Sequence, residues 1–267
     1  MKNKFSIITI VKNDKLNILT TLNSVKNQSF SKYEHIILDG NSNDGTSKII
    51  KKNLHKKIKY FRIKDKNLYD AINIAISKSN GDYIFLLHSG DFFFNSEVIK
   101  NINSYLNKKE DFIYGNLIYY KNFTIKRIWR YKSKDLHYYN AYKIAHPTLV
   151  IKRELLKKLK YNINFKISSD TDFLIKLLRF KKLKHRHIDR YFIFMLSGGL
   201  SNSFQSLFLK IAEDIKIYLS HFSYLGIFIY FYKILTKLKT IFLSKRDINR
   251  LKLILIKECK LLKKINR

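Results

Sequence analysis

The chain of 267 residues is poor in the residues that cross-link a fold or mark its turns, with one cysteine, one proline and eight glycines. It also has a single tryptophan. The single cysteine, Cys259, excludes an internal disulfide and a zinc site built from cysteines. Acidic residues are also scarce, since 20 Asp and Glu stand against 53 Lys and Arg, a formal net charge of +33. Such a charge attracts polyanions, either nucleic acid or an anionic membrane surface. A compositional skew toward Lys, Ile, Asn, Phe and Tyr, as AT-rich coding produces, explains the same charge without a functional cause.

Long apolar runs are absent as well. The most apolar late stretch, residues 222–232, is about half of the roughly 20 residues needed to span a bilayer. The first 11 residues are too few for a signal peptide and have no cleavage-site pattern. We therefore expect a cytoplasmic protein. A hydrophobic content of 46% argues against disorder, and the length suits one large α/β domain with an appendage.

Short apolar segments alternate with helical patterns over the first 90 residues. β-branched and aromatic residues predict strands at residues 5–11, 35–38, 58–63 and 83–87. Helical spacing follows the first three, beginning with Leu16, Leu19, Leu22 and Val25. This alternation predicts an α/β fold with a mostly parallel, doubly wound sheet flanked by helices. Further strands are expected around Gly115 and at residues 144–151, and further helices at residues 153–159 and after Asp170, with Ser169 or Asp170 as N-cap.

The turn after the first strand, Val11 to Lys15, contains no glycine. A dinucleotide pyrophosphate needs the close backbone approach of Gly-x-Gly-x-x-Gly at this turn, so a dinucleotide-binding domain is excluded. No Gly-x-x-x-x-Gly-Lys-Ser/Thr loop occurs either, which argues against a P-loop.

Three carboxylates stand at the ends of predicted elements. Asp39 and Asp91 follow the second and fourth strands, and Asp170 precedes an apolar helix. Each one alone is explained as a turn former or helix cap. Together they favour a site, because the carboxyl ends of parallel strands open onto one crevice.

Several segments, in this order, resemble glycosyltransferase family 2, which has the Rossmann-like GT-A fold. They are residues 5–13, ILDGNSNDGT (37–46), KNLYDAIN (66–73), HSGD (88–91), HPT (146–148) and SDTDFL (169–174). The resemblance covers roughly residues 4–202 and is strongest to a bacterial subgroup that builds surface polysaccharides. It implies a catalytic domain at residues 1–204, followed by a basic helical region at residues 205–267.

The resemblance also implies an activity and its site. The expected reaction is inverting transfer of a sugar from a nucleotide sugar, a UDP-sugar in particular, to a hydroxyl of a lipid-linked or growing polysaccharide acceptor of the O-antigen, capsule or lipooligosaccharide type. Asp170 matches the catalytic base. Asp91 matches a ligand of Mg²⁺ or Mn²⁺, and His146 is either a further ligand or a hydrogen-bonded histidine before Pro147. The residues expected to bind the nucleotide sugar are Val11, Lys12, Asn13, Asp39, Asp44, Lys66, Tyr69, Asp70, Asn73, Ser89 and Gly90.

One departure from the family concerns the metal. His88 and Gly90 stand where many members have acidic residues. One carboxylate together with phosphate oxygens and water is still a reasonable site for a hard cation.

The region of residues 205–267 has 14 Lys and Arg against 4 Asp and Glu, a net charge of +10. Its apolar residues Leu251, Ile254, Leu255, Leu262 and Ile265 recur at helical intervals. This predicts a basic amphipathic region, which either lies on an anionic membrane at the cytoplasmic face or packs on the catalytic domain. Two other classes stay open: a basic nucleic-acid- or membrane-binding protein and a catalytically degenerate scaffold. Without a reader motif, no specific nucleic acid is expected.

Overall fold

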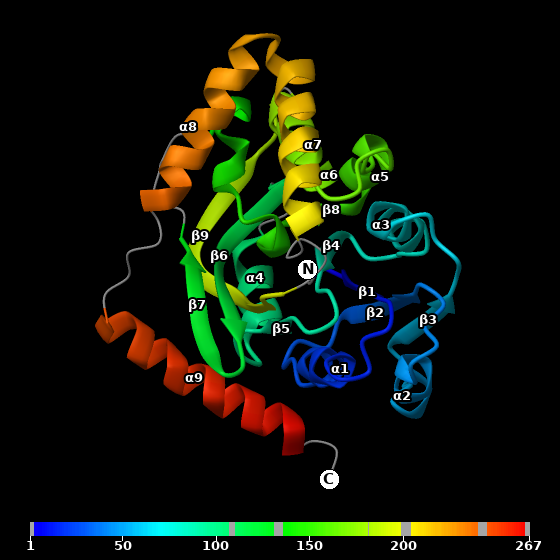
Figure 1. Ribbon diagram of the computed structural model, residues 1–267. Helices are drawn as coiled ribbons and strands as arrows, with labels where there is room; N and C mark the ends of the chain where they lie inside the picture. Colours follow the sequence, from blue (N-terminus) through cyan, green and yellow to red (C-terminus); the bar gives the residue numbers. More distant parts are fainter. Residues whose placement is uncertain are drawn as a thin grey trace.

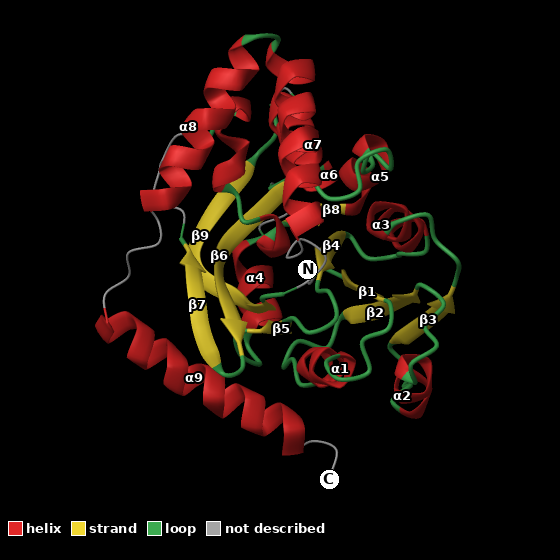
Figure 2. Cartoon of the chain, viewed as in Figure 1, coloured by secondary structure: helices red, strands yellow, loops and turns green. Residues whose placement is uncertain are grey.

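The computed structural model describes residues 3–106, 110–130, 136–180, 182–198, 204–239 and 245–264. Within these ranges the strands form one nine-stranded sheet, which is flanked by helices (Figures 1 and 2). The order of the strands is β3-β2-β1-β4-β8-β6-β9-β5, and β7 also pairs with β6. The α/β class predicted from the alternation of elements is confirmed.

The strands are β1 (Phe5–Val11), β2 (Tyr33–Asp39), β3 (Ile58–Arg62), β4 (Tyr83–Leu86), β5 (Phe92–Phe93), β6 (Phe112–Lys121), β7 (Thr124–Trp129), β8 (Val150–Lys152) and β9 (His185–Leu196). The α-helices are α1 (Ile18–Lys26), α2 (Thr46–Lys52), α3 (Leu68–Ser77), α4 (Val98–Tyr105), α5 (Arg153–Leu159), α6 (Ser169–Arg179), α7 (Phe204–Phe222), α8 (Leu225–Lys239) and α9 (Lys245–Lys264). Two short 3₁₀ helices are η1 (Tyr138–Lys143) and η2 (His146–Thr148).

The sheet has two parts with different strand directions. β1 pairs in parallel with β2 and β4, and β2 pairs in parallel with β3. β8 is antiparallel to both β4 and β6, whereas β9 is parallel to β6 and antiparallel to β5. The expected parallel sheet is therefore found in the first four strands, and the whole sheet is mixed.

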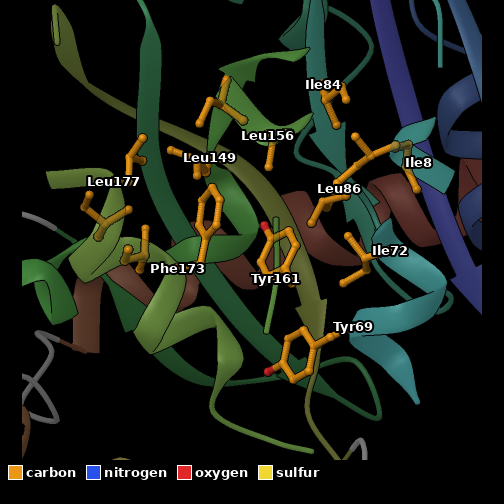
Figure 3. Close-up of a cluster of buried hydrophobic side chains, with 14 of the residues drawn as sticks. Ile8, Tyr69, Ile72, Ile84, Leu86, Leu149, Leu156, Tyr161, Phe173 and Leu177 are labelled. Carbon is orange, nitrogen blue, oxygen red and sulfur yellow. The ribbon is translucent and has the colours of Figure 1, made fainter. Parts of the chain in front are cut away.

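Buried side chains cover both faces of the sheet because successive residues of a strand point to opposite sides. Ile8 of β1 belongs to a cluster with α3, α5 and α6, while its neighbour Ile7 packs in a second cluster with α1 and α4. Figure 3 shows the first cluster, in which Tyr161 lies between Phe173 of α6 and Tyr69 of α3.

Some predicted boundaries were wrong. The strand expected at residues 144–151 is reduced to β8, because Pro147 cannot donate to a strand ladder and the chain forms η2 there. The first helix begins at Ile18, and Leu16 is 83% exposed. The N-cap of α6 is Ser168, so Asp170 lies inside the first turn. Ile265 lies outside the described residues.

The three C-terminal helices pack on the preceding fold at two separate places (Figure 1). Ile217 and Tyr218 of α7 and Tyr230 of α8 belong to the same buried cluster as α6. Helix α9 instead packs near β7 and α1, where Leu255 is fully buried. None of the helices in the described ranges is long and apolar enough to cross a membrane.

Candidate active site

The loops after β1, β2, β3 and β4 lie at one edge of the sheet, because these strands are parallel neighbours. The backbone N–H of Gly40 donates to the carbonyl of Val11 at 2.9 Å, and that of Ser89 donates to the carbonyl of Ile10 at 3.4 Å. Crevices at such edges are where open α/β sheets bind their ligands. The convergence predicted for Asp39 and Asp91 therefore exists at the level of the backbone.

The loops after β1 and β2 are held together by side chains that accept backbone N–H groups. Asn13 N–H donates to Ser42 Oγ at 2.8 Å, and Asn43 N–H donates to Asn13 Oδ1 at 2.9 Å. Asp14 N–H donates to Thr46 Oγ1 at 2.9 Å. Asn13 has a φ of +50°, a conformation that asparagine tolerates better than most residues. These bonds fix the corner after Val11.

Asp39 is fully buried and accepts hydrogen bonds from the loop after β2, from α2 and from β3. Its Oδ1 accepts the Ser42 N–H at 2.8 Å, and its Oδ2 accepts the hydroxyls of Ser47 and Tyr60. Burial favours the neutral acid, but these hydrogen bonds outweigh it and lower the pKa of Asp39. Each oxygen accepts at least one of these hydrogen bonds, so Asp39 helps to hold the loop from below.

Asp44 has a similar position in the loop. Its Oδ1 accepts from the N–H and the hydroxyl of Thr46, and its Oδ2 accepts the Lys15 N–H at 3.0 Å. The side-chain bond from Thr46 is the main reason that the pKa of Asp44 falls to about 2. Asp44 therefore caps the start of α2 and joins it to the loop after β1.

Lys12 and Asp65 face each other across Gly40. A Cβ on Gly40 would lie 2.6 Å from Asp65 Oδ2 and 3.3 Å from Lys12 Cδ, so glycine leaves room for both side chains. Burial raises the pKa of Asp65, the charge of Lys12 opposes this, and the charge of Asp70 adds to it. The sequence interpretation missed Asp65, although it follows the third predicted strand much as Asp39 follows the second.

The start of α3 lies at the same edge of the sheet. Asn67 Oδ1 caps the helix by accepting the N–H groups of Tyr69 and Asp70, and Asp70 Oδ2 accepts the Lys66 N–H at 3.0 Å. Two other residues expected to bind the sugar nucleotide face inward. The Tyr69 hydroxyl donates to the Ile167 carbonyl at 2.5 Å.

Asn73 is the second of these inward-facing residues. Its Nδ2 donates to the carbonyl of Tyr161 at 2.8 Å, and its Oδ1 accepts the N–H of the same residue at 2.9 Å. Asn73 thus fixes the backbone of Tyr161. The Tyr161 hydroxyl in turn lies 2.8 Å from His146 Nε2.

His146 and His88 lie beside each other in partly buried positions. Burial lowers the pKa of both, to about 4 for His88, and the charge of Asp170 opposes the shift at His146. Both imidazoles are therefore neutral at pH 7. Because His146 Nε2 is bonded to Tyr161, metal ligation by His146 would have to use Nδ1 or break that bond.

Asp170 lies in the first turn of α6, partly exposed. Its Oδ1 accepts the Thr171 N–H at 2.8 Å, and its Oδ2 has no hydrogen-bond partner within the described ranges. Its charge raises the pKa of Tyr69 and of Tyr161, although burial is the larger cause at both. Asp170 is thus close to α3 and to the His146–Tyr161 pair, with one oxygen left for a ligand.

The segment before Asp170 is clamped by Glu213 of α7. The Glu213 carboxylate accepts three successive backbone N–H groups, those of Lys166, Ile167 and Ser168, at 2.7 to 2.9 Å. Glu213 is only 8% exposed. With Tyr69 holding the carbonyl of Ile167, the segment is fixed from both sides. Sequence interpretation had no signal for Glu213, which lies 43 residues beyond Asp170 in the basic region expected either to contact a membrane or to pack on the catalytic domain.

Asp91 is only 4% exposed, and its Oδ1 accepts the Leu196 N–H at 2.9 Å. Burial raises the pKa of Asp91 to about 8, an effect that the Leu196 N–H opposes and the charge of Asp14 increases. Asp14 in turn accepts the Ser89 hydroxyl at 2.7 Å. Gly90 has a φ of +89°, and a Cβ there would lie 2.7 Å from Leu196 Cδ2. The conformation explains why position 90 holds glycine.

The model of glycosyl transferase family 2 matches residues 6–185. The chain belongs to this family. It is a glycosyltransferase with the GT-A fold, and the family predicted from the sequence is confirmed.

Similar proteins cover most of the transferase. A PGL/p-HBAD biosynthesis glycosyltransferase from Mycobacterium bovis is 23% identical over 74% of this chain and 79% of its own length. WfaP from Escherichia coli, a UDP-Glc:alpha-D-GlcNAc-diphosphoundecaprenol beta-1,3-glucosyltransferase, is 28% identical over 76% of this chain and 82% of its own.

Solved structures confirm the fold. The 1–349 fragment of S. aureus TarS in complex with UDP-GlcNAc superposes with a TM-score of 0.65 at 18% identity, over 82% of this chain and 67% of that one. The mannosyltransferase PcManGT from Pyrobaculum calidifontis, in complex with GDP-Man and Mn²⁺, has a TM-score of 0.56 at 14% identity, over 97% of this chain and 86% of that one.

The carboxylates of the transferase fit a metal ion held mainly by its substrate. Within the described ranges no group of three or more His, Cys, Asp or Glu could hold an ion. The Oδ2 of Asp91 has no hydrogen-bond partner there, and a nearby cation would offset the cost of its buried charge. Magnesium and manganese are commonly bound by one or two carboxylates and by substrate phosphates. The residues present therefore fit such an ion.

A hollow of about 440 Å³ elsewhere on the transferase is not this site. It is lined by Glu110, Leu183, Lys184, His185 and Arg186. The Tyr83 hydroxyl donates to the carbonyl of Glu110, which places the hollow near the amino end of β4. The strand-end loops lie at the opposite edge.

Proposed function

We propose that this transferase moves a sugar from a nucleotide sugar to a hydroxyl of a lipid-linked acceptor in surface-polysaccharide synthesis, with inversion and with Asp170 as the base. The relatives named above support the substrate class. WfaP uses UDP-Glc and an acceptor on diphosphoundecaprenol, and the TarS fragment binds UDP-GlcNAc. A UDP-sugar is therefore the first donor to test. The proposed location is the cytoplasmic face of the membrane, where such acceptors are elongated.

The observation that carries the proposal is the state of the carboxylates around the crevice. Asp39 and Asp44 are occupied by hydrogen bonds of the loops. Asp170 keeps Oδ2 for a ligand, and its position is fixed by the Glu213 clamp. A general base needs both a vacant acceptor atom and a fixed position.

The transfer follows from this arrangement. The acceptor hydroxyl attacks the anomeric carbon on the side opposite the departing diphosphate, and its proton passes to Asp170 Oδ2. His88 and His146 are neutral, so they bring no positive charge that would hold the proton back from Asp170. Lys12 and Asp65 lie beside Gly40, and in this proposal they contact the nucleotide. Of the residues expected to bind the donor, Asp39, Tyr69 and Asn73 act in this proposal by shaping the site.

A divalent ion, Mg²⁺ or Mn²⁺, would be held by Asp91, with Asp14 as the nearby second carboxylate. When bound, such an ion offsets the charge that develops on the diphosphate leaving group. We expect EDTA to abolish transfer and added Mn²⁺ or Mg²⁺ to restore it. Full activity in the chelator would refute the assignment of a metal.

The main test is the release of nucleoside diphosphate from UDP-, GDP- and dTDP-sugars, with and without an undecaprenyl-diphosphate-linked acceptor. We expect Asp170→Asn to lower turnover by about 10²–10⁴-fold, the usual contribution of a general base. Donor binding, measured by calorimetry, should be unchanged. Near-wild-type turnover of this variant would contradict the role of Asp170. No turnover of any donor by the wild type would favour the scaffold alternative.

A further inference from the structure

The hairpin of α7 and α8 presents a broad apolar surface. On α8 the exposed side chains recur at three- and four-residue intervals, which places them on one face. We define this outer face of α8 as Leu225, Phe228, Phe231, Tyr232 and Leu235, whose exposed fractions range from 56% to 71%. Soluble proteins rarely expose contiguous patches of large apolar side chains unless a partner or a membrane binds there.

The opposite face of α8 is fully used. Gly226, Tyr230 and Lys233 are buried against α7, and a Cβ on Gly226 would lie 2.2 Å from the carbonyl oxygen of Tyr218. Lys233 forms a buried ion pair with Asp214 at 2.8 Å. The hairpin is therefore held together from inside, and its outer face is free for another contact.

The distribution of charge on the hairpin indicates what kind of partner it could contact. Its two acidic residues, Glu213 and Asp214, are both turned inward, toward the segment before α6 and toward Lys233. Among the described side chains of the hairpin, the exposed ones include apolar and aromatic groups and Lys216 of α7, and no acidic group is exposed. An exposed face of aromatic and aliphatic residues without acidic groups, in a region of net charge +10, suits the interface of an anionic bilayer.

Helix α9 has the stronger basic amphipathic sequence, but its apolar face is buried in the fold. Its apolar residues Leu251, Leu255, Cys259 and Leu262 are buried against β6, β7 and β9. Asn23 of α1 also donates to the carbonyl of Leu262 at 2.7 Å. The apolar face of α9 is buried within the fold. A membrane contact of residues 205–267 would therefore be made by other helices of this region.

We infer that the outer face of α8 lies in the interface of an anionic membrane. This inference rests on the proposed function, since a lipid-linked acceptor is reached from a bilayer surface. It also links the membrane to the reaction, because α7 connects this hairpin to Asp170 through Glu213. Figure 1 shows the two helices projecting together beyond the sheet, with α9 at the other end of the molecule.

The test uses the full chain without donor or acceptor. Phe228 and Leu253 are both 71% exposed, on α8 and on α9, and form a matched pair. With vesicles of phosphatidylglycerol and phosphatidylcholine, Phe228→Trp should shift its emission to the blue and be quenched by brominated lipid. Leu253→Trp should show neither change, and Trp129 supplies a common background. Quenching of both probes equally, or of neither, would overturn the inference.

A second measurement removes the apolar contact. Phe228→Asp with Phe231→Asp should lower sedimentation with the anionic vesicles by about tenfold or more, whereas Leu253→Asp should sediment like the wild type. Unchanged binding of the double variant would show attraction by charge alone and overturn the inference. A blue shift of Phe228→Trp that grows with protein concentration before vesicles are added would indicate a second copy instead, and would also overturn it. Hydrolysis of the donor in solution, measured in parallel, tests the proposed reaction independently.

Discussion

The strand-end loops (residues 12–15 and 40–45) and the α6 junction (residues 166–170) border one crevice but use their polar groups in opposite ways. In the strand-end loops the carboxylates of Asp39 and Asp44 accept hydrogen bonds from their own surroundings. In the α6 junction the backbone is held by Glu213 and Tyr69 from outside, and Asp170 is left with a vacant oxygen. We therefore expect the reactive aspartate to be one whose surroundings are held in place by other residues.

The largest expected effect on stability lies in the strand-end loops. Asp39→Asn should lower the free energy of unfolding by about 3 kcal/mol, because it removes charge-assisted hydrogen bonds from a buried group. Denaturant unfolding measures this, with Asp170→Asn as the matched control, expected to stay within about 0.5 kcal/mol of the wild type. An Asp39→Asn protein of normal stability that fails to bind donor would instead make Asp39 a nucleotide contact.

A buried histidine of β2, His35, should also make the stability depend on pH. Burial, with a smaller contribution from the charge of His55, lowers the pKa of His35 to about 3. The unfolded chain takes up this proton near pH 6.5, so the stability is complete above that pH and falls as the pH drops toward 3. Between pH 7 and pH 5 we expect a loss of about 2 kcal/mol from His35. Urea unfolding at both pH values should show a correspondingly smaller loss for His35→Gln.

At the α6 junction the effect should be on catalysis. Glu213→Gln leaves one acceptor oxygen for three N–H groups, so the position of Asp170 loosens, and kcat should fall about tenfold with little change in donor KM. The fall should vanish in an Asp170→Asn background, because Glu213 acts through Asp170. An equal tenfold fall in both backgrounds would mean that Glu213 serves only the overall fold.

The smallest expected effect concerns Asp65. Asp65→Asn removes the charge of one of the two side chains proposed to contact the nucleotide. Because this contact is weakened, donor KM should rise by about fivefold, the equivalent of roughly 1 kcal/mol, with kcat unchanged. Steady-state kinetics with a saturating acceptor measure this. A change in kcat alone would place Asp65 in the chemical step and weaken the division between the two regions.

Sequence patterns predicted the family and the elements around the site well. The strands that lead to Asp39 and Asp91 were predicted because their short apolar runs end abruptly at polar corners. Asp65 was missed because a basic stretch surrounds it and no glycine marks its turn. Glu213 was missed because no local pattern joins α7 to a segment more than 40 residues earlier.

By itself the sequence determined the strands and helices of the first 90 residues, since the period of their apolar residues fixes the face that each one buries. It also determined the family, through motifs whose order is specific. Only the tertiary structure decided which of the similar aspartates, among them Asp91 and Asp170, keep a vacant oxygen and which amphipathic helix keeps its apolar face exposed. Both depend on contacts between residues far apart in the chain, such as Glu213 with Ile167 and α9 with β7, which no local pattern encodes.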